Sequence, residues 1–280
     1  MTTADHARLP TRQLLQPDLP AFDAATLDQR TRDALAELLL SMADDEFICG
    51  FWDSEWTGIA PLLEEDVAFS SLAQDEIGHA RLLYEMVGRL TGEDADRLAF
   101  HRPPEAYHHA RLLDHPRTDW AFSIARRWLY DTADAVRLAA LARSSFRPLA
   151  EAVAKIRREE RYHLMHLDAW MRRLAAHAGE PRARLESALR TLAPDSLTVF
   201  APLAGEAVLT EAGVVAEPMA KLADRWLSEV GARLAEWGLP AMAESRPPAD
   251  GRDHAQPAES FRWLWEEFTS VARLEEGVEW

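Results

Sequence analysis

Two short stretches, "LAQDEIGHAR" (72–81) and "REERYHL" (158–164), decide the fold. Each contains the pattern Glu-x-x-His, which pairs Glu76 with His79 and Glu160 with His163. In an α-helix, residues three apart lie roughly 60° apart around the axis and one turn apart along it. Both side chains of a pair can therefore reach one point beside the helix. This is the spacing that two ligands of one metal ion need.

Both pairs lie on the apolar faces of their segments, so we expect all four side chains to face a core. Leu72 and Leu83 bracket the first pair, and Ile156 and Leu167 bracket the second. An unpaired charge on a core face costs several kcal/mol, so buried carboxylates need cations. Arginine, protonated histidine or a metal ion could serve. Only a metal ion explains why each glutamate comes with a histidine at the same offset.

Working outward from these stretches, the sequence predicts an all-α fold. Strand signals are almost absent, and the long segments between turns are rich in Ala, Leu, Arg and Glu. Four long helices are expected, joined by two short turns and one long crossover at 91–118. Their ranges are 28–56, 65–90, 119–144 and 148–177. This connectivity is typical of a ferritin-like four-helix bundle.

The remaining residues are expected to extend a single domain. An N-terminal extension covers 1–25, the bundle covers 26–178, and a helical extension packed on the bundle covers 179–280. Within that extension we expect additional C-terminal helices and a polar linker. The helices are placed around 182–193, 217–237 and 258–274, and the linker at 244–258.

The other two helices of the bundle should supply one carboxylate each at the same level. In an antiparallel hairpin, residues equidistant from the turn lie side by side. Reflecting Glu76 through the first turn gives Glu46, and reflecting Glu160 through the second gives a position one residue from Asp131. The reflection is good to a residue or two. Asp45 and Asp134 therefore remain alternatives.

Four carboxylates and two imidazoles projecting inward form the ligand set of a di-iron or di-manganese carboxylate centre. The predicted ligands are Glu46, Glu76, His79, Asp131, Glu160 and His163, and no catalytic residue is predicted beyond them. Oxygen ligands combined with imidazole suit iron or manganese. Asp75 and Glu159 are placed to accept hydrogen bonds from the outer nitrogens of the histidines, and Asp134 lies near them as well. The crossover histidines, including His109, are expected at the surface.

Composition excludes several classes of function. The chain has 280 residues, 48% of them hydrophobic, and a formal charge of −16, so it can build a large core but lacks the clustered cations that nucleic acid requires. It contains one cysteine, Cys49, which cannot form a disulfide framework or ligate an iron–sulfur cluster alone. No signal peptide or membrane span is evident. We therefore expect a soluble, cytoplasmic protein with no nucleic-acid or membrane partner.

Further motifs carry a family resemblance. They are "GIAPLLEEDVAFSSLAQDEIGHAR" (58–81), "LTGEDADRLAFHR" (90–102), "REERYHL" and the terminal "EEGVEW" (275–280). Together they resemble the ferritin-like subunits of the multicomponent phenylacetyl-CoA epoxidase (phenylacetate oxygenase) family, most closely the C-type subunit. In that family the C-type subunit is generally a structural partner with a degraded metal site, whereas the A-type subunit keeps the iron ligands. This sequence departs from that pattern because it holds a full candidate ligand set.

The resemblance implies oxygen-dependent epoxidation of an aromatic acyl-CoA. The implied cofactor is a pair of iron ions, with manganese or a mixed manganese–iron pair as alternatives. The implied partners are the aromatic acyl-CoA, O₂, a related ferritin-like subunit and a separate reductase, in a homo- or hetero-oligomer. Two alternatives remain: a non-catalytic scaffold subunit of the same complex, and a ferritin-like metal-binding protein with ferroxidase activity.

Overall fold

A computed structural model describes residues 21–242 and 246–274 of the chain. Within these ranges the protein is built from helices and contains no strand. The expected all-α, ferritin-like bundle with additional C-terminal helices is confirmed. None of the helices in the described part is long and apolar enough to cross a membrane.

The four long helices begin and end within about two or three residues of the expected positions. They are α2 (Gln29–Ser54), α3 (Leu63–Thr91), α5 (Trp120–Leu141) and α6 (Arg147–Ala176). Asp28 and Asp119 accept hydrogen bonds from backbone N–H groups in the first turns of α2 and α5, which fixes where these helices start. Gly92 ends α3 in the left-handed conformation that favours glycine.

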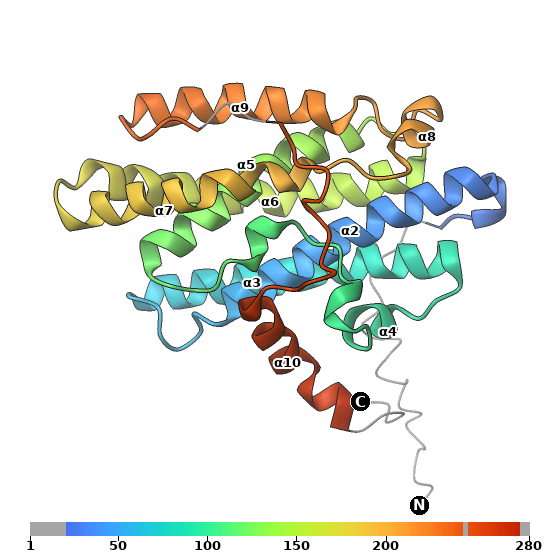
Figure 1. The fold of residues 1–280 in the computed structure, drawn as a ribbon, viewed down its shortest axis with the longest axis horizontal. Helices are drawn as coiled ribbons and strands as arrows, with labels where there is room; N and C mark the ends of the chain where they lie inside the picture. Colours follow the sequence, from blue (N-terminus) through green and yellow to red (C-terminus); the bar gives the residue numbers. More distant parts are fainter. Residues whose placement is uncertain (1–20, 243–245, 275–280) are drawn as a thin grey trace, which may run out of the picture.

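Two helical hairpins form the bundle. The first pairs α2 with α3 and the second pairs α5 with α6, and Figure 1 shows them lying along one another. Helix α3 contacts α6, which joins the hairpins. Side chains of α5 reach α2 through the core, as when the Tyr130 hydroxyl donates to Glu46. The inner faces of all four helices therefore meet.

The crossover between α3 and α5 is more structured than the sequence suggested. It contains the short helix α4 (Ala95–Phe100) and two 3-10 turns, Pro104–Ala106 and Arg111–Asp114. Its backbone is fixed by hydrogen bonds to distant segments: the Arg111 N–H donates to the Gly251 carbonyl, and the Leu112 N–H donates to the Thr198 hydroxyl. Such long-range contacts leave no local pattern in the sequence.

The C-terminal helices pack around the bundle. They are α7 (Glu180–Ser196), α8 (Glu206–Glu211), α9 (Met219–Glu236) and α10 (Glu259–Leu274). Helices α7 and α9 pack against α5, whereas α10 lies on the opposite side and contacts α2 and α4 (Figure 1). Most of the expected N-terminal extension and the terminal "EEGVEW" motif lie outside the described residues.

Candidate metal centre

The six side chains singled out by the sequence come together between α2, α3, α5 and α6. None of them is more than 4% exposed. Their carboxylate oxygens and imidazole nitrogens form two groups that share Glu160. The first contains Glu46, Glu76, His79 and Glu160, and the second contains Asp131, Glu160 and His163.

The first group has the dimensions of a metal site. The His79 Nδ1 atom lies 3.5 Å from Glu46 Oε2 and 3.5 Å from Glu160 Oε1. Ligand atoms about 2 Å from a common ion are separated by roughly this distance. Each of the four residues also carries one buried atom that has no hydrogen-bond partner, namely Glu46 Oε2, Glu76 Oε2, His79 Nδ1 and Glu160 Oε1. Buried polar atoms without partners are rare, and a cation would satisfy all four at once.

The second group is continuous with the first. His163 Nδ1 lies 3.1 Å from Glu160 Oε1 and 3.2 Å from Glu76 Oε1, so both glutamates lie close to it. Both carboxylate oxygens of Asp131 are buried without a hydrogen-bond partner. Glu160 Oε1 is the atom that lies near both imidazoles, so Glu160 would contribute to both groups if they held ions.

The outer nitrogens of the two histidines are held reciprocally across α3 and α6. His79 on α3 donates through Nε2 to Glu159 on α6, at 2.7 Å. His163 on α6 is paired through Nε2 with Asp75 on α3, at 3.1 Å. These bonds turn each Nδ1 atom toward the cluster, which is the role that outer carboxylates play for metal-binding histidines.

Burial and mutual repulsion shape the electrostatics of the cluster. Burial, together with the charge of Glu76, raises the pKa of Glu46 well above its usual value, and the Tyr130 hydroxyl donates to the other Glu46 oxygen. Burial also raises the pKa of Asp131. Despite its own burial, His79 has a raised pKa because the carboxylates of Glu159 and Glu46 lie beside its imidazole and favour its protonated form. The cluster thus has more carboxylates than its surroundings can neutralise, and it favours cations.

An arginine that the sequence analysis did not single out lies against the second group. The Arg127 guanidinium contacts Glu76 Oε1, lies 3.1 Å from Asp131 Oδ1 and 3.1 Å from His163 Nδ1, and holds the pKa of Glu76 well below its usual range against the effect of burial. Arg127 lies one turn before Asp131 on α5 and on the same face, so the helical period, applied outward from Asp131, could have found it. Arginine is one of the three counter-charges considered for the core acids, and Arg127 provides it for Glu76 and Asp131.

The two alternative carboxylates have other partners. Asp45 accepts hydrogen bonds from Arg137 and from both terminal nitrogens of Arg252, whose charges lower its pKa despite burial. Asp134, which the sequence placed near the cluster, pairs with Arg137 at 2.6 Å. The geometry favours Glu46 and Asp131 over these neighbours as members of the cluster.

The residues therefore fit a metal-binding centre, with a difference between the two positions. Among the described interactions, Arg127 contacts one member of the first group, Glu76. It contacts two members of the second group, Asp131 and His163. Asp53, also missed by the sequence analysis, lies 3.4 Å from a different guanidinium nitrogen, Nη1.

One crossover histidine expected at the surface is buried instead. His109 is fully buried and contacts Asp114 at 2.9 Å, and its ring packs against that of His254 with centroids 4.0 Å apart. His254 Nε2 lies 3.5 Å from the same Asp114 oxygen. The expectation was wrong because the segment containing His254 covers the crossover, a contact between residues far apart in the chain.

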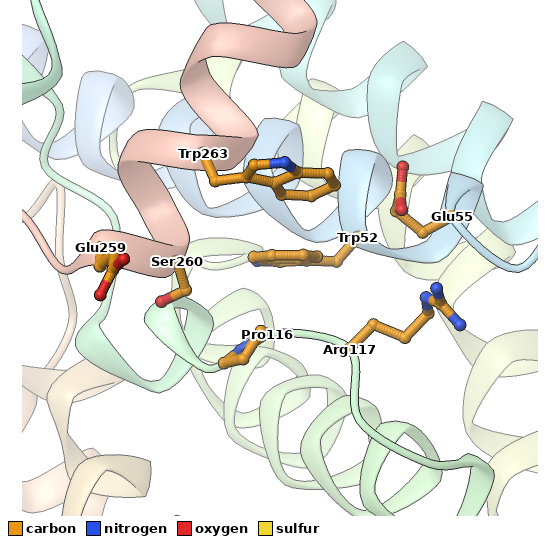
Figure 2. Close-up of a pocket in the computed structure, with 7 residues that line it drawn as sticks. All are labelled: Trp52, Glu55, Pro116, Arg117, Glu259, Ser260 and Trp263. Carbon is orange, nitrogen blue, oxygen red and sulfur yellow. The ribbon is translucent and has the colours of Figure 1, made fainter.

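A separate pocket of about 580 Å³ opens beside α2 and α10 (Figure 2). Trp52 and Trp263 stack there, with ring centroids 6.0 Å apart and an interplanar angle of 21°. The remaining lining residues are Glu55, Pro116, Arg117, Glu259 and Ser260. None of the six clustered side chains lines this pocket.

Comparisons with known proteins identify the family of the chain. Residues 17–280 match the model of the family described as "Phenylacetic acid catabolic protein". The chain is 28% identical to the C subunit of the 1,2-phenylacetyl-CoA epoxidase of Escherichia coli (strain K12) over 219 residues, which cover 78% of this chain and 88% of that protein. It is 26% identical to the A subunit of the same enzyme over 174 residues, covering 61% of this chain and 55% of that protein. The chain is therefore a member of the phenylacetic acid catabolic protein family.

Proposed function

We propose that this chain is the oxygen-activating subunit of a multicomponent oxygenase in phenylacetate catabolism, and that its bundle holds a pair of iron ions. The convergence of four buried carboxylates and two imidazoles, with unpartnered atoms on every member of the first group, carries the proposal. Similarity to two subunits of a phenylacetyl-CoA epoxidase supports the reaction class.

In this proposal Glu46, Glu76, His79 and Glu160 would hold one ion, and Asp131, Glu160 and His163 the other. Such a pair supplies the binding and reductive activation of O₂ when it is bound, which side chains alone cannot do. The chain's own residues provide the setting. Glu159 and Asp75 orient the two imidazoles, and the nearly complete burial of the ligands excludes water.

The partners follow from what the chain lacks. Cys49 is the only cysteine and it is buried, so a relay of iron–sulfur clusters cannot be built within this chain. Electrons would come from a separate reductase, and the net charge of −16 could help to attract a basic partner. By analogy with the subunits it resembles, the chain would work with a related ferritin-like subunit on an aromatic acyl-CoA.

One observation favours a second candidate, a scaffold subunit of the same complex. Arg127 already neutralises part of the carboxylate cluster, so the fold does not depend on two metal ions for all of its charge balance. A scaffold of this kind would keep the acids and histidines without turnover.

Metal analysis after growth in iron-supplemented medium separates the two candidates. The oxygenase proposal predicts about two irons per chain at saturation. It also predicts that O₂ oxidises the iron of the chemically reduced protein, which Mössbauer spectroscopy would detect. Protein that folds normally but neither retains nor takes up iron or manganese would instead be a scaffold.

A further inference from the structure

Arg127 is a buried cation with several contacts to the cluster. Its side chain is 1% exposed. Its Nη2 atom contacts Glu76 Oε1 and lies 3.1 Å from His163 Nδ1, and its Nε atom lies 3.1 Å from Asp131 Oδ1. One guanidinium therefore contacts three candidate ligands, and each of these ligands lies on a different helix.

These contacts are those that a second metal ion would need. An ion bonded to Asp131 and His163 at about 2 Å would lie against the same atoms that face the guanidinium. Arginine stays protonated in proteins, so the two cations would also repel each other at very short range. Arg127 and an ion in the second group therefore exclude one another.

The first group is different. The described interactions of Arg127 include none with Glu46 or His79. Four unpartnered ligand atoms surround that position, and they would bind a cation without moving the arginine. The two positions thus differ in what must be displaced before an ion can bind.

The structure also provides a place for the displaced guanidinium. Asp53 Oδ2 is buried without a hydrogen-bond partner and lies 3.4 Å from Arg127 Nη1. This nitrogen donates to Cys49 Sγ at 2.7 Å and contacts neither Asp131 nor His163. A small shift of the side chain toward Asp53 would exchange the ion pairs with Glu76 and Asp131 for a close ion pair with Asp53. The buried positive charge would stay compensated.

We infer that Arg127 is a built-in competitor for the second metal ion, so that the centre fills in a fixed order. The first ion binds Glu46, Glu76, His79 and Glu160, and the second binds Asp131, Glu160 and His163 only when Arg127 withdraws to Asp53. This inference rests on the proposed metal centre and concerns its regulation.

The test is a titration of chelator-treated, full-length protein with Mn²⁺, in which electron paramagnetic resonance measures the free ion. Wild-type protein should bind one ion at least about tenfold more tightly than the next, a difference of about 1.4 kcal/mol. In Arg127→Gln the second ion should gain at least about tenfold more affinity than the first. Arg143→Gln is the control, because Arg143 lies just beyond the end of α5, is exposed and pairs with Glu217.

A second variant keeps the test decisive if Arg127→Gln does not fold. Asp53→Asn removes the alternative partner of the guanidinium, so the second ion should bind several-fold more weakly relative to the first. Equal changes at both positions in Arg127→Gln, or no relative change in Asp53→Asn, would overturn the inference and leave the metal centre in place. If wild-type and variant proteins bind no Mn²⁺ at all while circular dichroism shows them folded, the proposed function itself fails.

Discussion

Glu160 shows how much a single residue contributes to the cluster. Its Oε1 atom lies 3.5 Å from one imidazole and 3.1 Å from the other, so one carboxylate belongs to both groups. Its neighbour Glu159 points to the outside of the cluster and only positions His79. Adjacent residues of the same type thus have separable roles.

Replacing these two neighbours should separate binding from positioning. Glu160→Ala should abolish retention of metal through desalting, because both positions lose a ligand. Glu159→Ala should retain metal with affinity lowered by about 10- to 100-fold, as is usual when an outer partner of a ligand histidine is removed. Elemental analysis gives the metal content, and far-ultraviolet circular dichroism checks the helices. Equal losses in the two variants would contradict the assigned roles.

Replacing Glu46 should show that a residue needed to bind metal lowers the stability of the metal-free protein. Burial and the charge of Glu76 raise its pKa, so keeping it ionised at neutral pH is unfavourable in the metal-free protein. Metal-free Glu46→Gln should therefore unfold at a temperature no lower than wild type. The increase in Tm produced by added metal should shrink, because a ligand is lost. Differential scanning calorimetry with and without metal measures both, and a Glu46→Gln protein with an undiminished metal effect would argue against Glu46 as a ligand.

At this scale the sequence identified the six clustered residues by periodicity and by reflection through the turns. It did not identify Arg127 and Asp53. Their positions follow the same helical period, but the direction of a long guanidinium depends on which carboxylates the other helices present. That information exists only once the helices are packed.

The α2–α3 hairpin depends on a close approach at the level of the cluster. Gly50 lies one turn after Glu46, and a Cβ atom there would come within 3.0 Å of Glu76 Cβ and 3.1 Å of two Ile77 atoms. The absence of a side chain at this position lets α2 and α3 lie close enough for Glu46 and Glu76 to meet. Helix geometry and ligand geometry are thus set by the same residue.

Two glycine-to-alanine changes test this close approach. Gly78 lies on the exposed face of α3 with nothing near its Cβ position, so Gly78→Ala should stabilise the protein by about 0.5–1 kcal/mol through helix propensity. Gly50→Ala should lack that gain and should bind metal more weakly, because the helices must separate. Chemical denaturation and metal titration of both variants provide the measurement. Equal gains in stability would show that the contact between α2 and α3 is not tight.

Helix periodicity predicted the long helices to within about three residues, because capping residues such as Asp28 and Asp119 mark their ends in the sequence. The short helix α4 and the 3-10 turns of the crossover were not predicted. They are fixed by contacts with residues near 198 and 251 rather than by local sequence.

Across the whole molecule, the crossover is tied to the C-terminal region by His109, Asp114 and His254. The pKa of Asp114 is depressed because both histidines offset the effect of its burial, and burial lowers the pKa of His109. These contacts connect segments more than 130 residues apart in the sequence, so they hold the crossover and the C-terminal region together in the folded protein.

Lowering the pH should weaken the contacts among His109, Asp114 and His254 and destabilise the folded protein. His109 has a lowered pKa in the folded protein, so the unfolded chain binds more protons below about pH 6.5 and the free energy of unfolding falls as pH drops through that range. Asp114 has a depressed folded pKa, so its contribution is present above about pH 4 and is lost at lower pH. Urea denaturation at pH 7 and pH 5 should show that the free energy of unfolding falls less between these pH values in His109→Gln than in wild type. His177→Gln, at an exposed histidine, is the control and should behave as wild type.

The central claim is tested most directly by anomalous diffraction at the iron absorption edge, from crystals of iron-reconstituted protein. We predict iron beside Glu46, Glu76, His79 and Glu160, and a second peak beside Asp131, Glu160 and His163 in molecules whose Arg127 has moved to Asp53. An empty bundle at iron saturation, with Arg127 still bonded to Glu76 and Asp131, would contradict this prediction.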